Sequence, residues 1–507
     1  MAKISVSGLT FSYDGSYDDI FCEASFILDT NWKLGLMGRN GKGKTTLLRL
    51  LMGQYAYRGS ISSSVLFDYF PFQIREEEMG HDTIEVIEGI QPDYELWKIC
   101  RELDLLRVEA DILYRPYETL SHGERTKVML AVLFSRESYF LLIDEPTNHL
   151  DLETRELLCD YLKKKKGFIL VSHDRWLLDS CIDHVLALER NQIEVEKGNF
   201  SSWWENKQKR DRYEISENEK LKQEIKKMEE SARKASAWAE KAERSKIGFN
   251  PLVEHDRFLD TRAYIGEKAR RMQQRRKNLE RRQQTAIRDK EQLLKNLEQP
   301  VQLRLTPLTH HKETYVRAKE AAISYGSTRV IENFSMELKR GERILLQGKN
   351  GCGKSSVLKM ILQDAGISVP GVENLCIRGQ HELASGLEIS YINQDTSFLR
   401  GSLDAYMERE SIDGSLFRAV LRKLDLERTQ FEKNMEEYSE GQKKKVLIAS
   451  SLLKPAHLYI WDEPMNYIDI FSRMQIEDLI LEYAPTMLLV EHDKDFGSRC
   501  ATRVITI

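Results

Sequence analysis

Two stretches of the 507-residue chain share a glycine-rich pattern that ends in a lysine and a hydroxyl residue. When GxxxxGK[ST] lies between an apolar strand and a helix, its backbone N–H groups turn toward phosphate oxygens and its lysine neutralises phosphate charge. We expect Lys44 and Lys354 to have that role, and Thr45 and Ser355 to offer hydroxyls to Mg²⁺. The residues expected to cradle the phosphates are Gly38, Arg39, Asn40, Gly41, Lys42, Gly43, Lys44, Thr45 and Thr46, and Gly348, Lys349, Asn350, Gly351, Cys352, Gly353, Lys354, Ser355 and Ser356.

Each copy also contains an apolar run that ends in Asp-Glu-Pro. Asp144 and Asp462 end these runs, where a carboxylate can reach a magnesium ion through water. Glu145 and Glu463 follow directly, and a glutamate there can orient or deprotonate the water that attacks a phosphate. The two glutamates are therefore the predicted catalytic groups of a nucleotide hydrolase.

Histidine and glutamine side chains complete the predicted catalytic set. His173 and His492 each lie at the end of another apolar run, and we expect them to sense the terminal phosphate. Gln73 and Gln394 follow aromatic tracts, where their amides can meet Mg²⁺ and the attacking water. Phe72 stands between Pro71 and Gln73, so the register of the first glutamine is less clear than that of the second.

Two tyrosines precede the glycine-rich loops. Tyr13 and Tyr325 lie 25 and 23 residues before them. At that distance each ring can stack on adenine. The alternative is that these rings are ordinary core residues.

The chain contains an internal duplication. The glycine-rich loop recurs at an offset of 310, Ser-x-Gly and Asp-Glu-Pro recur at 318, and a His-Asp pair recurs at 319. In each unit, continuous apolar runs alternate with stretches of helical spacing, which predicts buried parallel strands covered by helices. We therefore expect an α/β fold with two P-loop ATPase domains, at residues 1–202 and 301–507, joined by a linker at residues 203–300.

The linker has the composition of long helices. Residues 205–246 hold no Gly or Pro and many charged residues, and the same composition resumes over residues 266–298. A break at residues 247–253 predicts an antiparallel helical hairpin with its tip at about residues 247–265. A helix of ~40 residues is about 60 Å long, so the tip would project beyond the ATPase domains. The alternative is a plain spacer.

The linker is also the basic part of the chain. Residues 201–300 hold 26 Lys and Arg against 18 Asp and Glu, whereas the whole chain has a net charge of −4. A basic arm between acidic bodies is typical of a segment that meets a polyanion. A solvated helix surface would also collect basic residues, so charge alone does not identify a partner.

A Ser-x-Gly motif stands before a predicted helix in each unit, as Ser121 with Gly123 and Ser439 with Gly441. A serine there can simply cap its own helix. Together with the glycine-rich loop and Asp-Glu-Pro, however, the pattern resembles that of ATP-binding-cassette ATPases. The resemblance implies two composite ATP sites, in which the Ser-x-Gly loop of one cassette closes on ATP held by the other.

The whole chain resembles the ABC-F group, which has two cassettes, a charged helical linker and no membrane segment. Asp144-Glu145-Pro146-Thr147-Asn148-His149-Leu150-Asp151 is typical of that group, and the second copy, at residues 461–469, is similar to its antibiotic-resistance branch (the Lsa- and Vga-like types). The resemblance implies a monomer that closes on ATP and enters the E site of the 70S ribosome. Its linker would lie along P-site tRNA and 23S rRNA. Its tip would then displace lincosamides, pleuromutilins or streptogramin A near the peptidyl-transferase centre.

The linker residues fit a nucleic-acid partner. Residues 257–288 hold 11 Lys and Arg against three acids, which suits a path along phosphates. Apolar tip side chains can pack on exposed bases. The residues expected to contact the ribosome or tRNA are Phe258, Leu259, Arg270, Arg271, Arg275, Arg276, Lys277, Arg281 and Arg282.

The rest of the sequence favours a cytoplasmic protein without a membrane partner. No uncharged apolar run reaches ~18 residues, the start does not read as a signal peptide, and the seven cysteines form no CxxC pair. The alternatives are a housekeeping ABC-F translation factor, a transporter-coupled ATPase and a chromosome or DNA-repair ATPase. His122 and Glu440 replace the commoner glycine within Ser-x-Gly, but the Ser and Gly that carry the contact remain in both copies, so we expect two competent sites whose relative rates the sequence leaves open.

Overall fold

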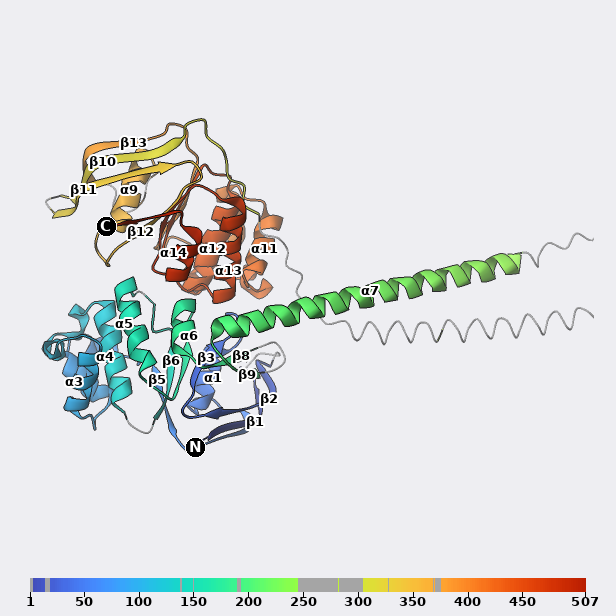
Figure 1. The fold of residues 1–507 in the computed structure, drawn as a ribbon, viewed down its shortest axis with the longest axis horizontal. Coiled ribbons are helices and arrows are strands. Elements are labelled where there is room, and N and C mark those ends of the chain that lie inside the picture. Colours follow the sequence, from blue (N-terminus) through green and yellow to red (C-terminus); the bar gives the residue numbers. More distant parts are fainter. Residues whose placement is uncertain are drawn as a thin grey trace, which may run out of the picture. The chain divides into compact units, whose positions relative to one another are not determined.

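The computed structural model describes residues 3–13, 19–136, 139–148, 150–188, 193–244, 281, 304–326, 328–367, 369 and 375–507. The chain divides into two compact units. Residues Met1–Trp203 and Val301–Ile507 form one unit, which contains both cassettes, and Trp204–Pro300 form the other (Figure 1).

The first cassette contains two sheets. One is three-stranded and antiparallel, with the order β2-β1-β4, and the other is six-stranded, with the order β5-β6-β7-β3-β8-β9. In the larger sheet only β9 is antiparallel to its neighbour. The strands are β1 (Lys3–Phe11), β2 (Phe21–Asp29), β3 (Lys33–Met37), β4 (Arg58–Ser63), β5 (Leu66–Phe70), β6 (Tyr139–Asp144), β7 (Phe168–Val171), β8 (His184–Leu188) and β9 (Ile193–Lys197). The α-helices are α1 (Lys44–Leu51), α2 (Thr83–Ile90), α3 (Leu96–Leu105), α4 (His122–Ser135), α5 (Leu152–Lys163) and α6 (Arg175–Cys181).

The second cassette repeats this plan with one strand fewer. Its antiparallel sheet has the order β11-β10-β13, and its parallel sheet has the order β14-β15-β16-β12-β17. The strands are β10 (Thr314–Tyr325), β11 (Thr328–Lys339), β12 (Arg343–Gln347), β13 (Leu375–Leu383), β14 (Ile389–Ile392), β15 (Leu458–Asp462), β16 (Met487–Val490) and β17 (Arg503–Thr506). The α-helices are α9 (Lys354–Asp364), α10 (Leu403–Glu410), α11 (Gly414–Lys423), α12 (Glu440–Leu453), α13 (Ile470–Tyr483) and α14 (Lys494–Cys500).

The parallel strands explain how the motifs meet. Strands β3, β6 and β7 are almost wholly buried, which accounts for their uninterrupted apolar sequences. Asp144 at the end of β6 pairs in register with Val171 at the end of β7, and β7 pairs with β3. Since the carboxyl ends of parallel strands share one edge of the sheet, the glycine-rich loop, the Asp-Glu-Pro loop and His173 converge there.

The α/β fold with two tandem P-loop cassettes is confirmed, with one addition. The antiparallel sheets were not expected from the long apolar runs, because their strands alternate between buried and exposed residues. In β1, for example, Ile4 and Val6 are buried while the flanking Lys3 and Ser7 are exposed.

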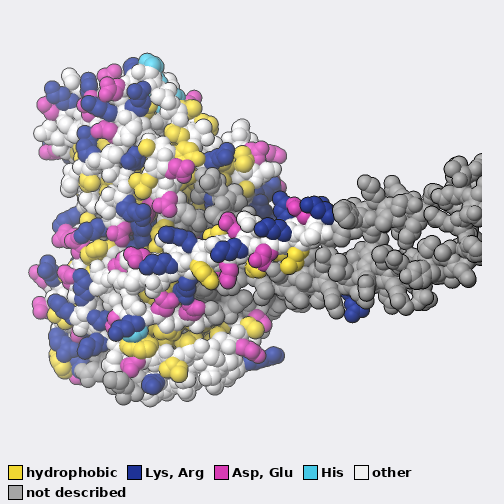
Figure 2. Space-filling view, turned by 45° about the vertical axis from the view of Figure 1, so that its right-hand side comes forward, with side chains coloured by type: hydrophobic (Ala, Val, Ile, Leu, Met, Phe, Trp, Pro, Cys, Tyr) yellow, Lys and Arg dark blue, Asp and Glu magenta, His cyan; other side chains and the backbone are white. Residues whose placement is uncertain are grey.

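The linker is described over its first helix. Helix α7 spans Phe200–Arg244, and Figure 2 shows charges of both signs along it. The predicted tip and the second predicted helix lie outside the described residues. So do the expected contact residues, except Arg281, which is helical and exposed. In the described ranges, no helix is both long and apolar enough to span a membrane.

Candidate active sites

The two glycine-rich loops have the geometry of phosphate cradles. Each leads into a helix, α1 or α9, whose N-terminus has no side-chain cap, so backbone N–H groups remain available to an anion. Gly43 has φ 86° and Gly353 has φ 105°. A Cβ atom would lie 2.6 Å from Ile20 in the first loop and 2.6 Å from Ile331 in the second. Both glycines are therefore required by conformation and by space.

The lysine of each loop donates hydrogen bonds to backbone carbonyl oxygens of the same loop. Lys44 Nζ donates to the carbonyl oxygen of Gly38 at 2.7 Å. Lys354 Nζ donates to the carbonyl oxygens of Gly348 at 2.9 Å and Lys349 at 2.8 Å. When a nucleotide binds, this ammonium can leave the carbonyl oxygens and form stronger hydrogen bonds with charged phosphate oxygens.

In both cassettes the hydroxyl residue and the aspartate expected to hold Mg²⁺ lie together, whereas Gln73 is exposed. Thr45 Oγ1 donates to Asp144 Oδ2 at 2.8 Å, and the hydroxyl of Tyr69 donates to the same oxygen at 3.1 Å. In the second cassette, Asp462 Oδ1 is buried and has no hydrogen-bond partner among the described residues. Burial and the charge of Glu463 raise the pKa of Asp462 to about 6, although Ser355 hydrogen-bonds to it. An unsatisfied carboxylate oxygen beside a hydroxyl fits a hard cation such as Mg²⁺.

Both predicted catalytic glutamates occupy the left-handed region, with φ 51° at Glu145 and φ 46° at Glu463. A non-glycine residue there costs of order 1–3 kcal/mol and persists only where the surroundings hold it. The backbone N–H of Glu145 donates to Val171 at 2.9 Å, and that of Glu463 donates to Val490 at 3.0 Å. The same strain at the same repeat position supports a functional role for both carboxylates.

The carboxylate of Glu145 is deeply buried. His173 Nε2 lies 3.2 Å from Glu145 Oε1. Burial, followed by the charge of Asp144, raises the pKa of Glu145 to about 8. Burial and the charges of Lys44 and Arg473 hold the pKa of His173 well below its usual value, so that imidazole is neutral.

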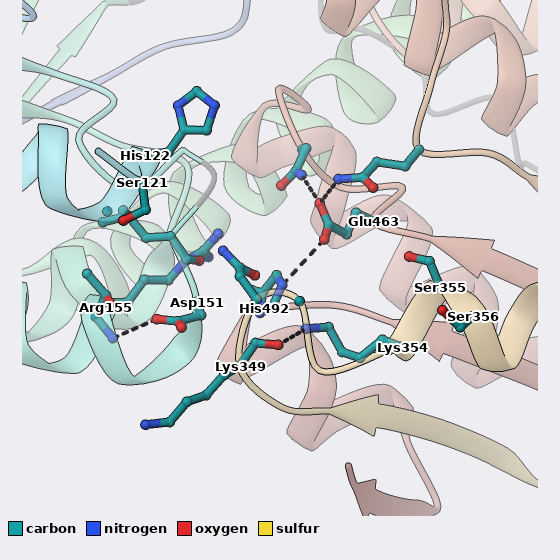
Figure 3. A pocket seen from close by; sticks show the side chains of 18 of the residues that line it. Ser121, His122, Asp151, Arg155, Lys349, Lys354, Ser355, Ser356, Glu463 and His492 are labelled. Carbon is teal, nitrogen blue, oxygen red and sulfur yellow. Dashed lines mark hydrogen bonds and ion pairs between the residues drawn. The ribbon is translucent and has the colours of Figure 1, made fainter. Parts of the chain in front are cut away.

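Glu463 has a different environment (Figure 3). Its Oε2 accepts hydrogen bonds from Gln394 Nε2 and Asn466 Nδ2, each at 2.8 Å, and His492 Nε2 lies 3.4 Å from its Oε1. Burial acts to raise the pKa of Glu463, but the His492 contact and the charges of Lys444 and Lys354 together lower it. The two pKa shifts therefore run in opposite directions, which favours the ionised form of Glu463 and the protonated form of Glu145.

A cavity of about 870 Å³ lies between the cassettes, which belong to one compact unit. Ser121 and Gly123 of the first cassette line it together with Lys354, Ser355 and Glu463 of the second (Figure 3). We call it site two. Its volume suits a nucleotide-sized ligand.

The Ser-x-Gly serines also cap their helices. Ser121 Oγ accepts from the backbone N–H of Glu124 at 3.2 Å, and Ser439 Oγ accepts from that of Gln442 at 3.3 Å. Capping therefore occurs, but it does not account for the placement of Ser121 and Gly123 in the same cavity as Lys354.

The glycine-rich loop of the first cassette also contacts the second cassette, and we call this place site one. Arg39 Nη1 contacts Asp425 Oδ1 at 2.5 Å, and Asn40 Nδ2 donates to the carbonyl oxygen of Tyr467 at 3.4 Å. A Cβ atom on Gly441 would lie 2.6 Å from that carbonyl oxygen. The glycine-rich loop of the first cassette thus lies against the segment that packs on the Ser439 loop.

Among the ion pairs that join the cassettes, two that involve α6 and α14 differ in burial. Arg175 of α6 pairs with Glu477 of α13, which is fully buried and also accepts from Arg499 Nη1 at 2.8 Å. On the other side, Lys494 Nζ contacts Glu156 Oε1 at 2.7 Å, and both side chains are 45% exposed. The repeat position of Glu477 in the first cassette is Cys159, so the buried pair has no counterpart.

The two tyrosines lie close to the cradles. Tyr13 is 42% exposed, and its hydroxyl is 2.8 Å from Thr46 Oγ1. The hydroxyl of Tyr325 donates to Ser356 Oγ at 3.2 Å, and its ring lines site two while packing partly on the core. Because Tyr13 is exposed, it is not an ordinary core residue, which was the alternative to adenine stacking.

The two glutamines differ. Gln394 contacts Glu463, whereas Gln73 is exposed. Sequence reasoning missed Asn466, although Asn148 repeats it at an offset of 318 and was a usable signal. It also missed Tyr69 and Lys444. The repeat position of Lys444 in the first cassette is Thr126, so comparing the two copies did not single out this lysine.

A family model described as ABC transporter matches residues 21–148 and 331–466. The chain belongs to the ABC transporter family. Both matches contain a glycine-rich loop and an Asp-Glu-Pro motif, so this ABC protein is an ATPase with two cassettes.

Relatives match the ABC protein along nearly its whole length. Ribosome protection protein VmlR of Bacillus subtilis is 26% identical over 98% of this chain and 85% of its own. ATP-binding protein Uup of Buchnera aphidicola is 26% identical over 99% and 80%. ABC transporter F family member 5 of Arabidopsis thaliana is 25% identical over 95% and 72%. With its two cassettes, the chain is an ABC-F ATPase.

A solved structure shares the fold. It is that of an archaeal ribosome recycling factor, aABCE1, in complex with a ribosomal stalk protein. It superimposes with a TM-score of 0.60 at 19% identity and covers 98% of this chain and 87% of its own. At that identity the likeness concerns the fold alone.

Proposed function

We propose that this ABC-F ATPase binds the ribosome and protects it from antibiotics. The observation that carries the proposal is similarity to a ribosome protection protein over 98% of the chain, including the linker. Residues 201–300 contain 26 Lys and Arg, and a segment this basic suits binding to the phosphates of tRNA and rRNA.

In the proposed cycle, ATP fills both composite sites and holds the cassettes together. Lys44 and Lys354 bind phosphate oxygens, and the Ser439 and Ser121 loops close on the opposite nucleotide. Mg²⁺, held by Thr45 with Asp144 and by Ser355 with Asp462, would neutralise phosphate charge. Glu463, fixed by Gln394 and Asn466, orients and deprotonates the attacking water. Hydrolysis then releases the cassettes.

The linker would carry the effect to the drug. We propose that the closed protein occupies the E site and that its linker lies along P-site tRNA. Phe258 and Leu259 at the tip would approach the peptidyl-transferase centre and displace lincosamides, pleuromutilins or streptogramin A. The basic residues after the tip would bind 23S rRNA and tRNA phosphates.

A second candidate is housekeeping translation. Uup is as similar to this chain as VmlR, at 26% identity, so identity alone does not separate the two functions. Both candidates predict ribosome binding, and only the first predicts resistance.

The test is expression of the full chain in a drug-sensitive host. We expect higher inhibitory concentrations for a lincosamide and a pleuromutilin, and no protection from Lys44→Ala with Lys354→Ala, which cannot hold ATP. Phe258→Ala and Leu259→Ala should weaken protection but leave ATP hydrolysis intact. Unchanged inhibitory concentrations together with ATP-dependent ribosome binding would favour the housekeeping function.

A further inference from the structure

Lys444 lies between the Ser439 loop and the catalytic carboxylate of the second cassette. It belongs to α12, and only 2% of its surface is exposed. Its Nζ donates to the carbonyl oxygen of Asn393 at 3.0 Å. The next residue, Gln394, donates to Glu463 Oε2 at 2.8 Å. One lysine thus connects the helix that begins at the Ser439 loop with the residue that holds Glu463.

A second contact fixes the same two segments together. Thr396 Oγ1 donates to Glu440 Oε2 at 2.5 Å. Glu440 is the first residue of α12, and Lys443 Nζ lies 3.2 Å from its other oxygen. Residues 393–396 are therefore attached to the first two turns of α12 at two points, and the loop must follow the helix when the helix moves.

The charge of Lys444 is unusual for such a buried position. Burial lowers its pKa, while the carboxylates of Asp462, Glu491, Glu463 and Glu440 oppose this effect. A buried ammonium is costly unless it is paired, and an amide or apolar side chain would serve a purely structural contact at lower cost. The buried ammonium reaches the carbonyl oxygen of Asn393, so Lys444 is placed to hold residues 393–394 against α12.

The first cassette lacks this connection. Its residue at the repeat position is Thr126, whose Oγ1 donates to the carbonyl oxygen of His122 at 2.9 Å within its own helix, α4. Gln73 of the first cassette is exposed, whereas Gln394 contacts Glu463. The buried lysine is therefore one of the features that distinguish the two cassettes.

We propose that Lys444 is a positioning residue that transmits closure of the Ser439 loop on the nucleotide at site one to Glu463 at site two. As α12 moves with the Ser439 loop, Lys444 and Glu440 carry residues 393–396, and Gln394 then sets the orientation of Glu463. The corresponding path in the first cassette is broken at Thr126. The proposal rests on the assignment of Ser439 and Glu463 to the ATP sites, and it holds whether or not the protein acts on ribosomes.

The first test measures kcat and KM for ATP hydrolysis by the full chain. Lys444→Thr copies the first cassette, Lys444→Arg keeps the charge, and Lys433→Thr removes an exposed charge outside α12. We expect Lys444→Thr to lower kcat about tenfold with little change in KM, because Glu463 is misoriented while the phosphate cradle is untouched. Lys444→Arg should restore most of the rate, and Lys433→Thr should keep it.

Two readouts separate positioning from general damage. Positioning through Gln394 predicts that kcat falls while KM stays, and that Lys444→Arg restores the rate because it keeps a donor for the carbonyl oxygen of Asn393. A change in KM as large as that in kcat, no rescue by Lys444→Arg, or an equal loss in Lys433→Thr would overturn the proposal.

The second test is a double-mutant cycle between Ser439→Ala and Lys444→Thr. If the lysine transmits closure, the double variant should be little slower than the slower single variant. Effects that multiply independently would refute the link. If Ser439→Ala and Glu463→Gln each leave turnover unchanged, the site assignment itself is wrong, which is a distinct outcome.

Discussion

The two cassettes use the same motifs but surround their glutamates differently. Burial and then the charge of Asp144 raise the pKa of Glu145 to about 8. Glu463 accepts from Gln394 and Asn466, and contact with His492 and the charge of Lys444 lower its pKa. A general base must be ionised before it can accept a proton. A motif repeated within one chain therefore has a different protonation equilibrium in each copy.

The largest expected effect comes from removing both carboxylates. Glu145→Gln with Glu463→Gln should lower kcat by a factor of about 10² to 10⁴ while ATP still binds, because the cradles are intact. The closed form should then accumulate on ribosomes. Steady-state hydrolysis and co-sedimentation with 70S particles measure both results. Normal turnover would show that neither glutamate acts in hydrolysis.

A stability measurement sharpens the comparison of the two cassette contacts. Arg175→Leu should lower the free energy of unfolding by about 2 kcal/mol, because Glu477 stays buried with Arg499 as its remaining partner. Lys494→Leu should cost about 0.5 kcal/mol, since its pair with Glu156 is exposed. Denaturant unfolding of both variants gives the difference. Equal losses of unfolding free energy in the two variants would contradict the larger contribution expected of the buried pair.

The single glutamate variants test the protonation difference directly. At pH 7, Glu463→Gln should lower kcat about tenfold more than Glu145→Gln, because a carboxyl with a pKa of about 8 is mostly protonated there. As pH rises through 8, Glu145 ionises and the Glu463→Gln variant should regain rate. A Glu463→Gln variant whose rate stays flat between pH 7 and 9 would contradict the raised pKa.

The smallest expected effect concerns the two glutamines. Gln394→Ala should lower kcat by about threefold to tenfold, because it removes one hydrogen bond to Glu463. Gln73→Ala should change it by less than about twofold, because Gln73 is exposed. Measuring kcat for both variants tests this difference. Equal losses of kcat would mean that Gln73 moves toward Glu145 and the nucleotide when ATP binds.

Local patterns predicted the glycine-rich loops before helices and the carboxylates at strand ends, because GxxxxGK[ST] and Asp-Glu-Pro each mark such a position within a few residues. The repeat extended that prediction to both halves of the fold. It could not predict Lys444, because a position that differs between the copies carries no repeat signal. Nor could it predict the pair of Arg175 and Glu477, since contacts between residues 302 positions apart depend on how the cassettes face each other.

The buried Arg175–Glu477 pair has a consequence for how such a protein can evolve. In a dimer of identical subunits, every substitution appears on both sides of the symmetry axis, so an arginine introduced for one contact also enters the other. Fusion of the halves in one polypeptide removes that restriction. Arginine and glutamate can then each be chosen for one side alone, and the two halves become specific for each other and no longer interchangeable.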